Sequence, residues 1–231
     1  MQYLKKFIFL SIPKTAAVSI KAALRPHRDK LINGIGPGLK TAVQAKKSFS
    51  KEDWDSYFKF TIVRNPWRRI WSNFCFRVGR LETYRDKHRL EKFLSAVKLD
   101  MQLSERSGYE DWERGILKNM KTIDNFFNAW GSYKGAFKKI VYDHEPQSDY
   151  YLSDEGKNML DFIMDFDVLR EDFSFVCENL KIEPPKKLPH INKVDYDKIN
   201  LDFEEFYTED LIEMVSEKDK KTIQLKKYEF S

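Results

Sequence analysis

Two short apolar runs, about fifty residues apart, each end at a basic residue and lead into a helix-like pattern. The first run is Phe7 to Ile12, which Lys14 follows after Pro13. The second run is Phe58 to Val63, which Arg64 follows directly. Continuous apolar runs of this length predict strands buried on both faces of a parallel sheet. Because strand-to-helix junctions with a cation hold phosphate-like groups in α/β proteins, the pair predicts two anion-binding junctions.

The size and composition predict one globular domain over residues 1–231. The chain has 231 residues, of which 42% are hydrophobic and 33% are charged, so it can bury a sizeable core. The net charge of +5 favours an anionic partner, but it is far from the strongly basic footprint of a nucleic-acid binder. Since the two charge signs are mixed along the chain, we expect no nucleic-acid partner.

Strand and helix patterns alternate along the chain. A third strand is predicted over Phe162 to Leu169, and helices are predicted over Thr15 to Leu24, 91–140 and Phe203 to Val215. This alternation indicates an α/β fold with a central parallel sheet and helices on both faces. Within 91–140 the predicted core residues are Phe93, Leu94, Trp112, Ile116, Phe126, Phe127 and Trp130.

Cysteine usage and hydropathy predict a location inside the cell. Cys75 and Cys177 lie on the apolar sides of predicted helices, which favours two buried thiols over a disulfide. The N-terminal apolar run is too short for a signal peptide, and no stretch of about 18 apolar residues predicts a membrane span. We therefore expect a cytoplasmic protein.

The first junction offers several groups to an anion. Lys14 supplies a compact positive charge, and the residues after it supply backbone amides and two hydroxyls. These residues are Thr15, Ala16, Ala17, Val18 and Ser19. The glycine spacing of a Walker A loop is absent, so the predicted cradle is P-loop-like only in its role. The glycine-rich stretch Asn33 to Gly38 has no strand before it and is predicted to be a surface loop.

The second junction leads into a strongly patterned helix. Asn65 can cap this helix and Pro66 suits its first position. The apolar stripe that would face the core comprises Trp67, Ile70, Trp71, Phe74 and Val78. Ser72 lies roughly 140° from the centre of that stripe, between Arg68 and Arg69. The pattern predicts an open, polar face that carries a hydroxyl beside two cations.

Both junctions resemble motifs of one enzyme family. The segment Ile12-Pro13-Lys14-Thr15-x-x-x-Ser19 is similar to the 5′-phosphosulfate motif of sulfotransferases that use 3′-phosphoadenosine 5′-phosphosulfate (PAPS). The segment Arg64-Asn65-Pro66-x-x-Arg69-x-x-Ser72 is similar to their 3′-phosphate motif. Three later segments resemble the carbohydrate branch of the family, which includes Golgi-type and bacterial members: His144-Glu145-Pro146-Gln147-x-x-Tyr150, Phe162 to Phe173, and Leu188 to Lys193.

The resemblance implies a function and a set of site residues. It implies a PAPS-dependent sulfotransferase that moves a sulfuryl group to an acceptor hydroxyl, on a carbohydrate. Lys14 would stabilise the leaving phosphate, Thr15 to Ser19 would hold the 5′-phosphate, and Arg64 with Ser72 would clamp the 3′-phosphate. Asn192 and Lys193 would contact the nucleotide. Positioning and charge would drive the transfer, and no metal is expected.

A base must take the proton of the acceptor, and histidine is the usual choice. We predict that His144 is this base, because it lies in a family-like segment, whereas His27 and His88 are predicted to be surface residues. His190 could instead order the loop that carries Asn192 and Lys193. A carboxylate, either Glu145 or Asp143, stays as an alternative.

The chain departs from the family pattern at two places. Ser11 stands where the family has histidine, and Ala16, Ala17 and Val18 stand where it favours Gly-Gly-Thr. A non-catalytic homologue that binds PAPS or its product is therefore one alternative function. A nucleotide kinase with a similar cradle is another.

The acidic residues Asp165, Asp167, Glu171 and Asp172 are predicted to be solvated strand-end groups rather than a cation site.

Overall fold

The computed structural model describes residues 6–27, 41–103, 108–189 and 201–230. Their contacts divide the chain into two compact units. The first unit comprises Met1–Ile70, His144–Lys193 and Ile212–Ser231, and the second comprises Trp71–Asp143 and Val194–Leu211. Each unit combines segments that are distant in sequence, so the division does not follow one boundary in the chain. A single domain over residues 1–231 stays a prediction.

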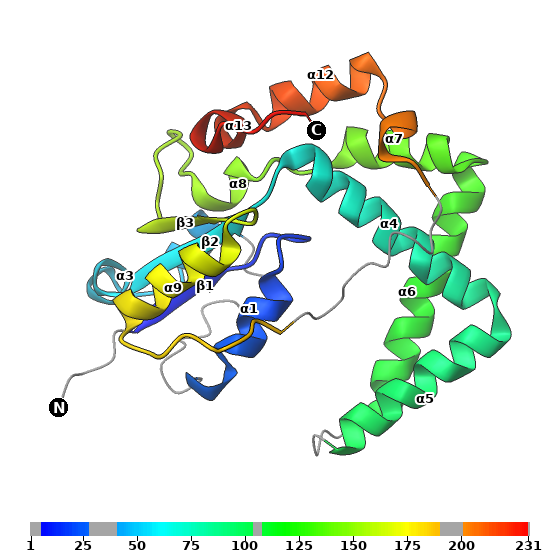
Figure 1. Ribbon diagram of the computed structural model, residues 1–231, viewed down its shortest axis with the longest axis horizontal. Coiled ribbons are helices and arrows are strands. Elements are labelled where there is room, and N and C mark those ends of the chain that lie inside the picture. Colours follow the sequence, from blue (N-terminus) through cyan, green and yellow to red (C-terminus); the bar gives the residue numbers. More distant parts are fainter. Residues whose placement is uncertain (1–5, 28–40, 104–107, 190–200, 231) are drawn as a thin grey trace. The chain divides into compact units, whose positions relative to one another are not determined.

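The first unit contains the sheet and the shorter helices (Figure 1). Its elements are β1 (Phe7–Leu10), α1 (Ala17–Ala23), the 3-10 helix η1 (Arg25–His27), α2 (Ala42–Lys46), α3 (Lys51–Ser56), β2 (Phe58–Val63), the start of α4 (Pro66–Arg85), α8 (Ser148–Tyr151), β3 (Phe162–Asp165), α9 (Leu169–Leu180), most of α12 (Glu209–Lys218) and α13 (Lys220–Lys226). The prediction of an α/β fold with a central parallel sheet flanked by helices is confirmed.

The three strands form one parallel sheet in the order β1-β2-β3. Phe9 is level with Phe60, and Phe60 is level with Phe162 on the other side. Since all three strands run in the same direction, their carboxyl ends lie at one edge of the sheet. The segments after Leu10, Val63 and Asp165 are therefore neighbours, although they are far apart in sequence.

Helices cover both faces of this sheet, because alternate side chains of each strand point to opposite sides. On one face Phe7, Phe9, Phe60 and other buried side chains pack with α1 and α9. On the other face Ile8, Leu10 and their neighbours pack with α2, α3 and α8. This arrangement explains why most side chains of the strands are apolar.

The third strand is shorter than predicted. β3 ends at Asp165, whereas the sequence pattern extended it to Leu169. The carboxylate of Asp165 accepts a hydrogen bond from the amide of Asp167 at 3.0 Å, and the amide of Asp165 donates to the carboxylate of Asp172 at 2.6 Å. These bonds stabilise a turn, so the apolar residues after it belong to the turn and to α9.

The second unit is helical. It contains the rest of α4, α5 (Lys87–Leu103), α6 (Tyr109–Trp130), α7 (Tyr133–Asp143) and α11 (Phe203–Phe206). The helical prediction for 91–140 is thus largely confirmed. Of the seven predicted core residues only Phe127 is buried. Trp130 is 44% exposed, because it is the last residue of α6 and a left-handed Gly131 follows it, and the remaining five are partly exposed: Phe93, Leu94, Trp112, Ile116 and Phe126. The buried stripe of α6 is formed by Met120, Ile123 and Phe127.

Cys75 and Cys177 are both free and buried, as predicted. Burial raises the pKa of the Cys177 thiol to about 11.

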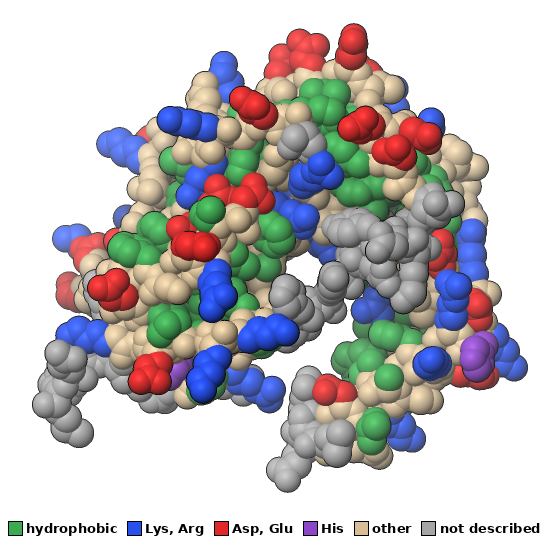
Figure 2. Space-filling model, in the orientation of Figure 1, with side chains coloured by type: hydrophobic (Ala, Val, Ile, Leu, Met, Phe, Trp, Pro, Cys, Tyr) green, Lys and Arg blue, Asp and Glu red, His purple; other side chains and the backbone are tan. Residues whose placement is uncertain are grey.

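Among the described residues, none of the helices combines the length and apolarity needed to cross a bilayer. Acidic and basic side chains are interspersed over the face shown in Figure 2, in keeping with the modest net charge. The glycine-rich segment Asn33 to Gly38 lies outside the described residues.

Candidate functional site

The first junction is a turn with an unusual backbone. Lys14 has φ 70° and Ala16 has φ 63°, both in the left-handed region, whereas Thr15 between them does not have a positive φ. Alternation of this kind turns successive amides toward one side, as in the backbone nests that bind anions. The Thr15 side chain is buried, and its hydroxyl donates to the carbonyl of Ile12 at 2.9 Å. The turn is therefore held by a side chain that it contains.

The helix after this turn begins later than predicted. α1 starts at Ala17 rather than Thr15, because the left-handed conformation of Lys14 and Ala16 is incompatible with a helix. The amide of Ile20 donates to the carbonyl of Ala16. Ser19 is buried, whereas Val18 is 49% exposed, so the valine in place of the family's threonine points away from the core.

The second junction lies beside the first. The Nη1 atom of Arg64 is 3.4 Å from the carbonyl oxygen of Lys14, a long hydrogen bond. The guanidinium lies over the ring of Phe166, 4.2 Å from its centroid. Among the residues that the structure describes, no carboxylate lies within ion-pair distance of Arg64. The two predicted cations thus come from adjacent strand ends at one edge of the sheet.

Acidic residues follow β3 at this edge of the sheet. Burial and the nearby charge of Asp165 raise the pKa of Asp167, while the charges of Arg64 and Arg68 lower it in part. The carboxylates of Asp165 and Asp172 are occupied by backbone amides, as the turn after β3 requires. These contacts give the acidic residues a structural role.

The start of α4 matches the prediction in its caps and differs in its exposed face. The amide of Arg68 donates to the Asn65 side chain at 3.3 Å, and Pro66 is the first helical residue. Arg69 and Ser72, however, are only 7% and 5% exposed, so the predicted open face around Ser72 is wrong. Arg69 donates to the carbonyl of Glu145 at 2.6 Å, which covers that side of the helix.

The side chain of the predicted base, His144, is buried. It is 4% exposed, and its Nε2 lies 3.0 Å from Oδ2 of Asp219. Glu145 accepts a hydrogen bond from the hydroxyl of Tyr150 at 2.6 Å, and burial together with this bond raises the pKa of Tyr150. Of the other two described histidines, His88 is exposed and His27 is partly exposed.

Two residues at the site were not singled out from the sequence. Gln147 is completely buried, and its carboxamide binds the main chain of Arg64. Asp219 is also completely buried and accepts a hydrogen bond from the main-chain amide of Gln147 at 2.9 Å. The family-like segment around His144 contains Gln147, which was the available signal. Nothing in the local sequence marks Asp219.

Three residues of the prediction cannot be placed. His190, Asn192 and Lys193 all lie outside the described residues.

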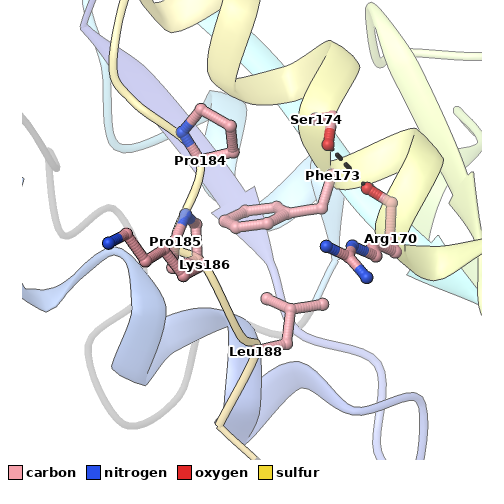
Figure 3. A pocket seen from close by; sticks show the side chains of 7 residues that line it. All are labelled: Arg170, Phe173, Ser174, Pro184, Pro185, Lys186 and Leu188. Carbon is pink, nitrogen blue, oxygen red and sulfur yellow. Dashed lines mark hydrogen bonds between the residues drawn. The ribbon is translucent and has the colours of Figure 1, made fainter.

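A small cavity lies elsewhere on the first unit. It occupies about 190 Å³ between the first half of α9 and the following proline-rich segment. Figure 3 shows the Phe173 ring between Pro184 and Leu188, with Arg170 and Lys186 on either side. Ligand pockets usually exceed about 300 Å³. None of the residues predicted to bind the anion lines this cavity, so it is separate from the two junctions.

Comparison with known proteins gives one match. The family model described as "Sulfotransferase family" matches residues 2–227, a range that includes both junctions and both units. Neither a curated protein nor a solved structure matches the chain.

Proposed function

The chain belongs to the sulfotransferase family, and on that premise we propose that it transfers a sulfuryl group from PAPS to an acceptor hydroxyl, on a carbohydrate. When bound, PAPS supplies the sulfuryl group and its nucleotide is the leaving group. The proposal assigns one end of this nucleotide to each of the two basic junctions.

One observation supports the proposal most directly. Arg64 Nη1 lies 3.4 Å from the carbonyl of Lys14, although fifty residues separate them in sequence. A nucleotide with a phosphosulfate at one end and a phosphate at the other needs two cationic sites within the span of one small molecule. The parallel sheet meets this need, because β1 and β2 end at the same edge.

The first junction suits the phosphosulfate end. Lys14 neutralises charge that develops on the leaving phosphate, and the amides of Ala16, Ala17 and Val18 bind its oxygens together with the hydroxyl of Ser19. Thr15 contributes its amide, because its hydroxyl proton is engaged by Ile12. The alternating backbone at Lys14 and Ala16 supports this assignment.

The second junction suits the 3′-phosphate. Arg64 can bind two phosphate oxygens at once through its planar guanidinium. Ser72 follows it by eight residues, the spacing of the family motif, and contributes a hydroxyl. Asn192 and Lys193 complete the nucleotide contacts in this proposal.

His144 is proposed as the base. Its contact with Asp219 resembles the carboxylate–histidine pairs that select one tautomer of the imidazole.

The carbohydrate acceptor and the cytoplasmic location belong to the proposal. The acceptor class depends on the likeness of the segments around His144, Phe162 and Leu188 to one branch of the family. Sulfate-transfer assays with different hydroxyl-bearing acceptors test this assignment.

A non-catalytic nucleotide-binding homologue is the second candidate. The burial of His144, with 4% of its side chain exposed, favours this candidate, because a base must reach the acceptor. Sulfate transfer from labelled PAPS to a panel of oligosaccharides separates the two functions.

The nucleotide assignment is tested by Arg64→Ala. We expect the variant to bind adenosine 3′,5′-bisphosphate at least about tenfold more weakly by calorimetry, because a charge-assisted contact is lost. Arg114→Ala is the control, since the Arg114 side chain is 76% exposed on α6. Unchanged affinity in Arg64→Ala would refute the 3′-phosphate role.

Lys14→Ala tests the role of the first junction. Removing one group that stabilises developing charge typically costs about a hundredfold in turnover. We expect kcat to fall by that order, while the affinity for the bisphosphate falls much less. Equal losses in both would show that Lys14 only anchors the nucleotide.

A further inference from the structure

The main chain of Arg64 is bound by a single side chain on both of its polar groups. The amide of Arg64 donates to Oε1 of Gln147 at 2.9 Å, and Nε2 of Gln147 donates to the carbonyl of Arg64 at 2.8 Å. The amide and carbonyl of one extended residue point to the same side, where an adjacent strand would normally pair with them. The carboxamide of Gln147 takes the place of that strand just beyond the end of β2.

Gln147 is itself held by a buried carboxylate. Gln147 is completely buried, and its main-chain amide donates to Oδ1 of Asp219 at 2.9 Å. The other oxygen of Asp219 faces Nε2 of His144 at 3.0 Å and Nη2 of Arg69 at 4.0 Å. Asp219, which joins α12 to α13, thus holds the backbone from which the Gln147 side chain extends.

These two hydrogen bonds restrict the backbone from which the Arg64 side chain extends. When the amide and carbonyl of a residue are both bonded, its backbone dihedrals are restricted and so is the direction of its Cα–Cβ bond. The guanidinium then lies over Phe166 and beside the carbonyl of Lys14. Preorganisation of this kind strengthens binding, because less freedom is lost when the ligand arrives.

We infer that Gln147, held by Asp219, is a positioning residue that aims Arg64 at the 3′-phosphate of the nucleotide. This inference rests on the proposed function. Gln147 has no need to touch the ligand, because it acts through the backbone of Arg64.

A residue that only stabilises the fold would lower the affinity for every nucleotide alike. A residue that positions Arg64 lowers the affinity only for nucleotides that carry a 3′-phosphate. The test is therefore the ratio of the affinities for adenosine 3′,5′-bisphosphate and adenosine 5′-phosphate, measured by calorimetry on the whole chain.

Gln147→Met removes both hydrogen bonds and preserves the length of the side chain. We expect the affinity ratio of this variant to be at least about tenfold lower than that of the wild type, while its affinity for adenosine 5′-phosphate stays within about threefold of the wild-type value. In the Arg64→Ala background, we expect Gln147→Met to change the ratio no further, because its effect passes through Arg64. A further loss of the same size in that background would overturn the inference.

Thr222→Val is the matched control. The Thr222 side chain is also completely buried, and its hydroxyl bonds to that of Tyr151 at 3.1 Å, away from Arg64. We expect this variant to lose stability without changing the ratio. A ratio that fell equally in both variants would show a general effect of destabilisation and would overturn the inference.

A second variant serves if Gln147→Met is unfolded at the assay temperature. Gln147→Glu retains an acceptor for the Arg64 amide and loses the donor to the Arg64 carbonyl. We expect it to lower the ratio at least threefold, and a wild-type ratio would overturn the inference.

The failures of the inference and of the proposed function are distinguishable. If the wild-type protein does not favour the 3′-phosphorylated nucleotide, the proposed function and the inference both fail. If it does, and Arg64→Ala abolishes the preference while Gln147→Met retains it, only the inference fails.

Discussion

At the scale of single residues, the turn between β1 and α1 has an uncommon backbone conformation. Lys14 and Ala16 both have positive φ, although neither is glycine. A left-handed conformation costs an L-residue about 1–2 kcal/mol, because Cβ approaches a neighbouring carbonyl. Strain of this size is kept where the surrounding structure imposes it, often at a functional site. Here it is imposed where we propose that the phosphosulfate binds.

Ala16→Gly should relieve this strain. We expect the free energy of unfolding to rise by about 0.5–1 kcal/mol, since the strain removed exceeds the extra entropy that glycine gives the unfolded chain. Urea denaturation measures the difference. Ala22→Gly, in the last turn of α1, is the control and should lower the free energy of unfolding by about 0.5–1 kcal/mol. A loss of the same size at position 16 would show that the turn is not strained.

At the scale of elements, the start of α4 shows how a helix is joined to the rest of its unit. The oxygen of the Asn65 side chain caps the helix through the amide of Arg68, and the nitrogen donates to the carbonyl of Glu229 at 2.8 Å. The indole of Trp67 donates to the carbonyl of Ile212 at 3.2 Å. The caps of α4 were predictable from local sequence. Its apolar stripe was predictable too, since the predicted residues Trp67, Ile70, Trp71, Phe74 and Val78 are all buried. The burial of Arg69 was not, because it depends on the segment around Glu145, 76 residues later.

Asn65→Ala should therefore cost more than the loss of an ordinary cap. We expect the free energy of unfolding to fall by about 2–3 kcal/mol, from the cap and from the bond to Glu229 together. Ser50→Ala removes the exposed cap of α3, where the hydroxyl accepts only the amide of Asp53, and should cost about 1 kcal/mol. Equal losses in urea denaturation would show that the bond to Glu229 contributes nothing.

At the scale of the whole molecule, the C-terminal segment returns to the sheet and stabilises it. Lys226 donates to the carbonyl of Ile163 at 2.7 Å, and the hydroxyl of Tyr228 donates to Asp165 at 2.6 Å. Burial and this bond raise the pKa of Tyr228. The same segment carries Asp219, which binds Gln147. The first unit is thus completed by the segment from Asp219 to Tyr228, which packs back onto it.

Tyr228→Phe should loosen this segment. We expect a loss of about 1.5–3 kcal/mol in the free energy of unfolding, the usual contribution of a hydrogen bond to a charged group, and faster tryptic cleavage after Lys227. Tyr57→Phe is the control, because its hydroxyl also binds an aspartate at 2.6 Å, but one only four residues away. If both variants resisted trypsin as well as the wild type, the C-terminal segment would be held by other contacts.

Because the pKa of Tyr228 is raised above 10.0, the hydroxyl's contribution to the free energy of unfolding is present below that pH and decreases as the pH rises further.

The strands β1 and β2, the caps of α4 and the basic residue after each strand could be predicted from the sequence alone, because each of these depends on residues within a few positions of one another. Hydrophobic periodicity and turn chemistry are local, and they were sufficient for β1 and β2. Which polar side chains are buried around those junctions followed only from the tertiary structure. The side chains of Ser72, Arg69 and His144 are buried there, and hydrogen bonds join Arg64 to Gln147 across 83 residues and Gln147 to Asp219 across 72 residues. The physical reason is that a side chain's burial and its hydrogen bonds depend on which distant segments pack against it, and the local sequence does not record that.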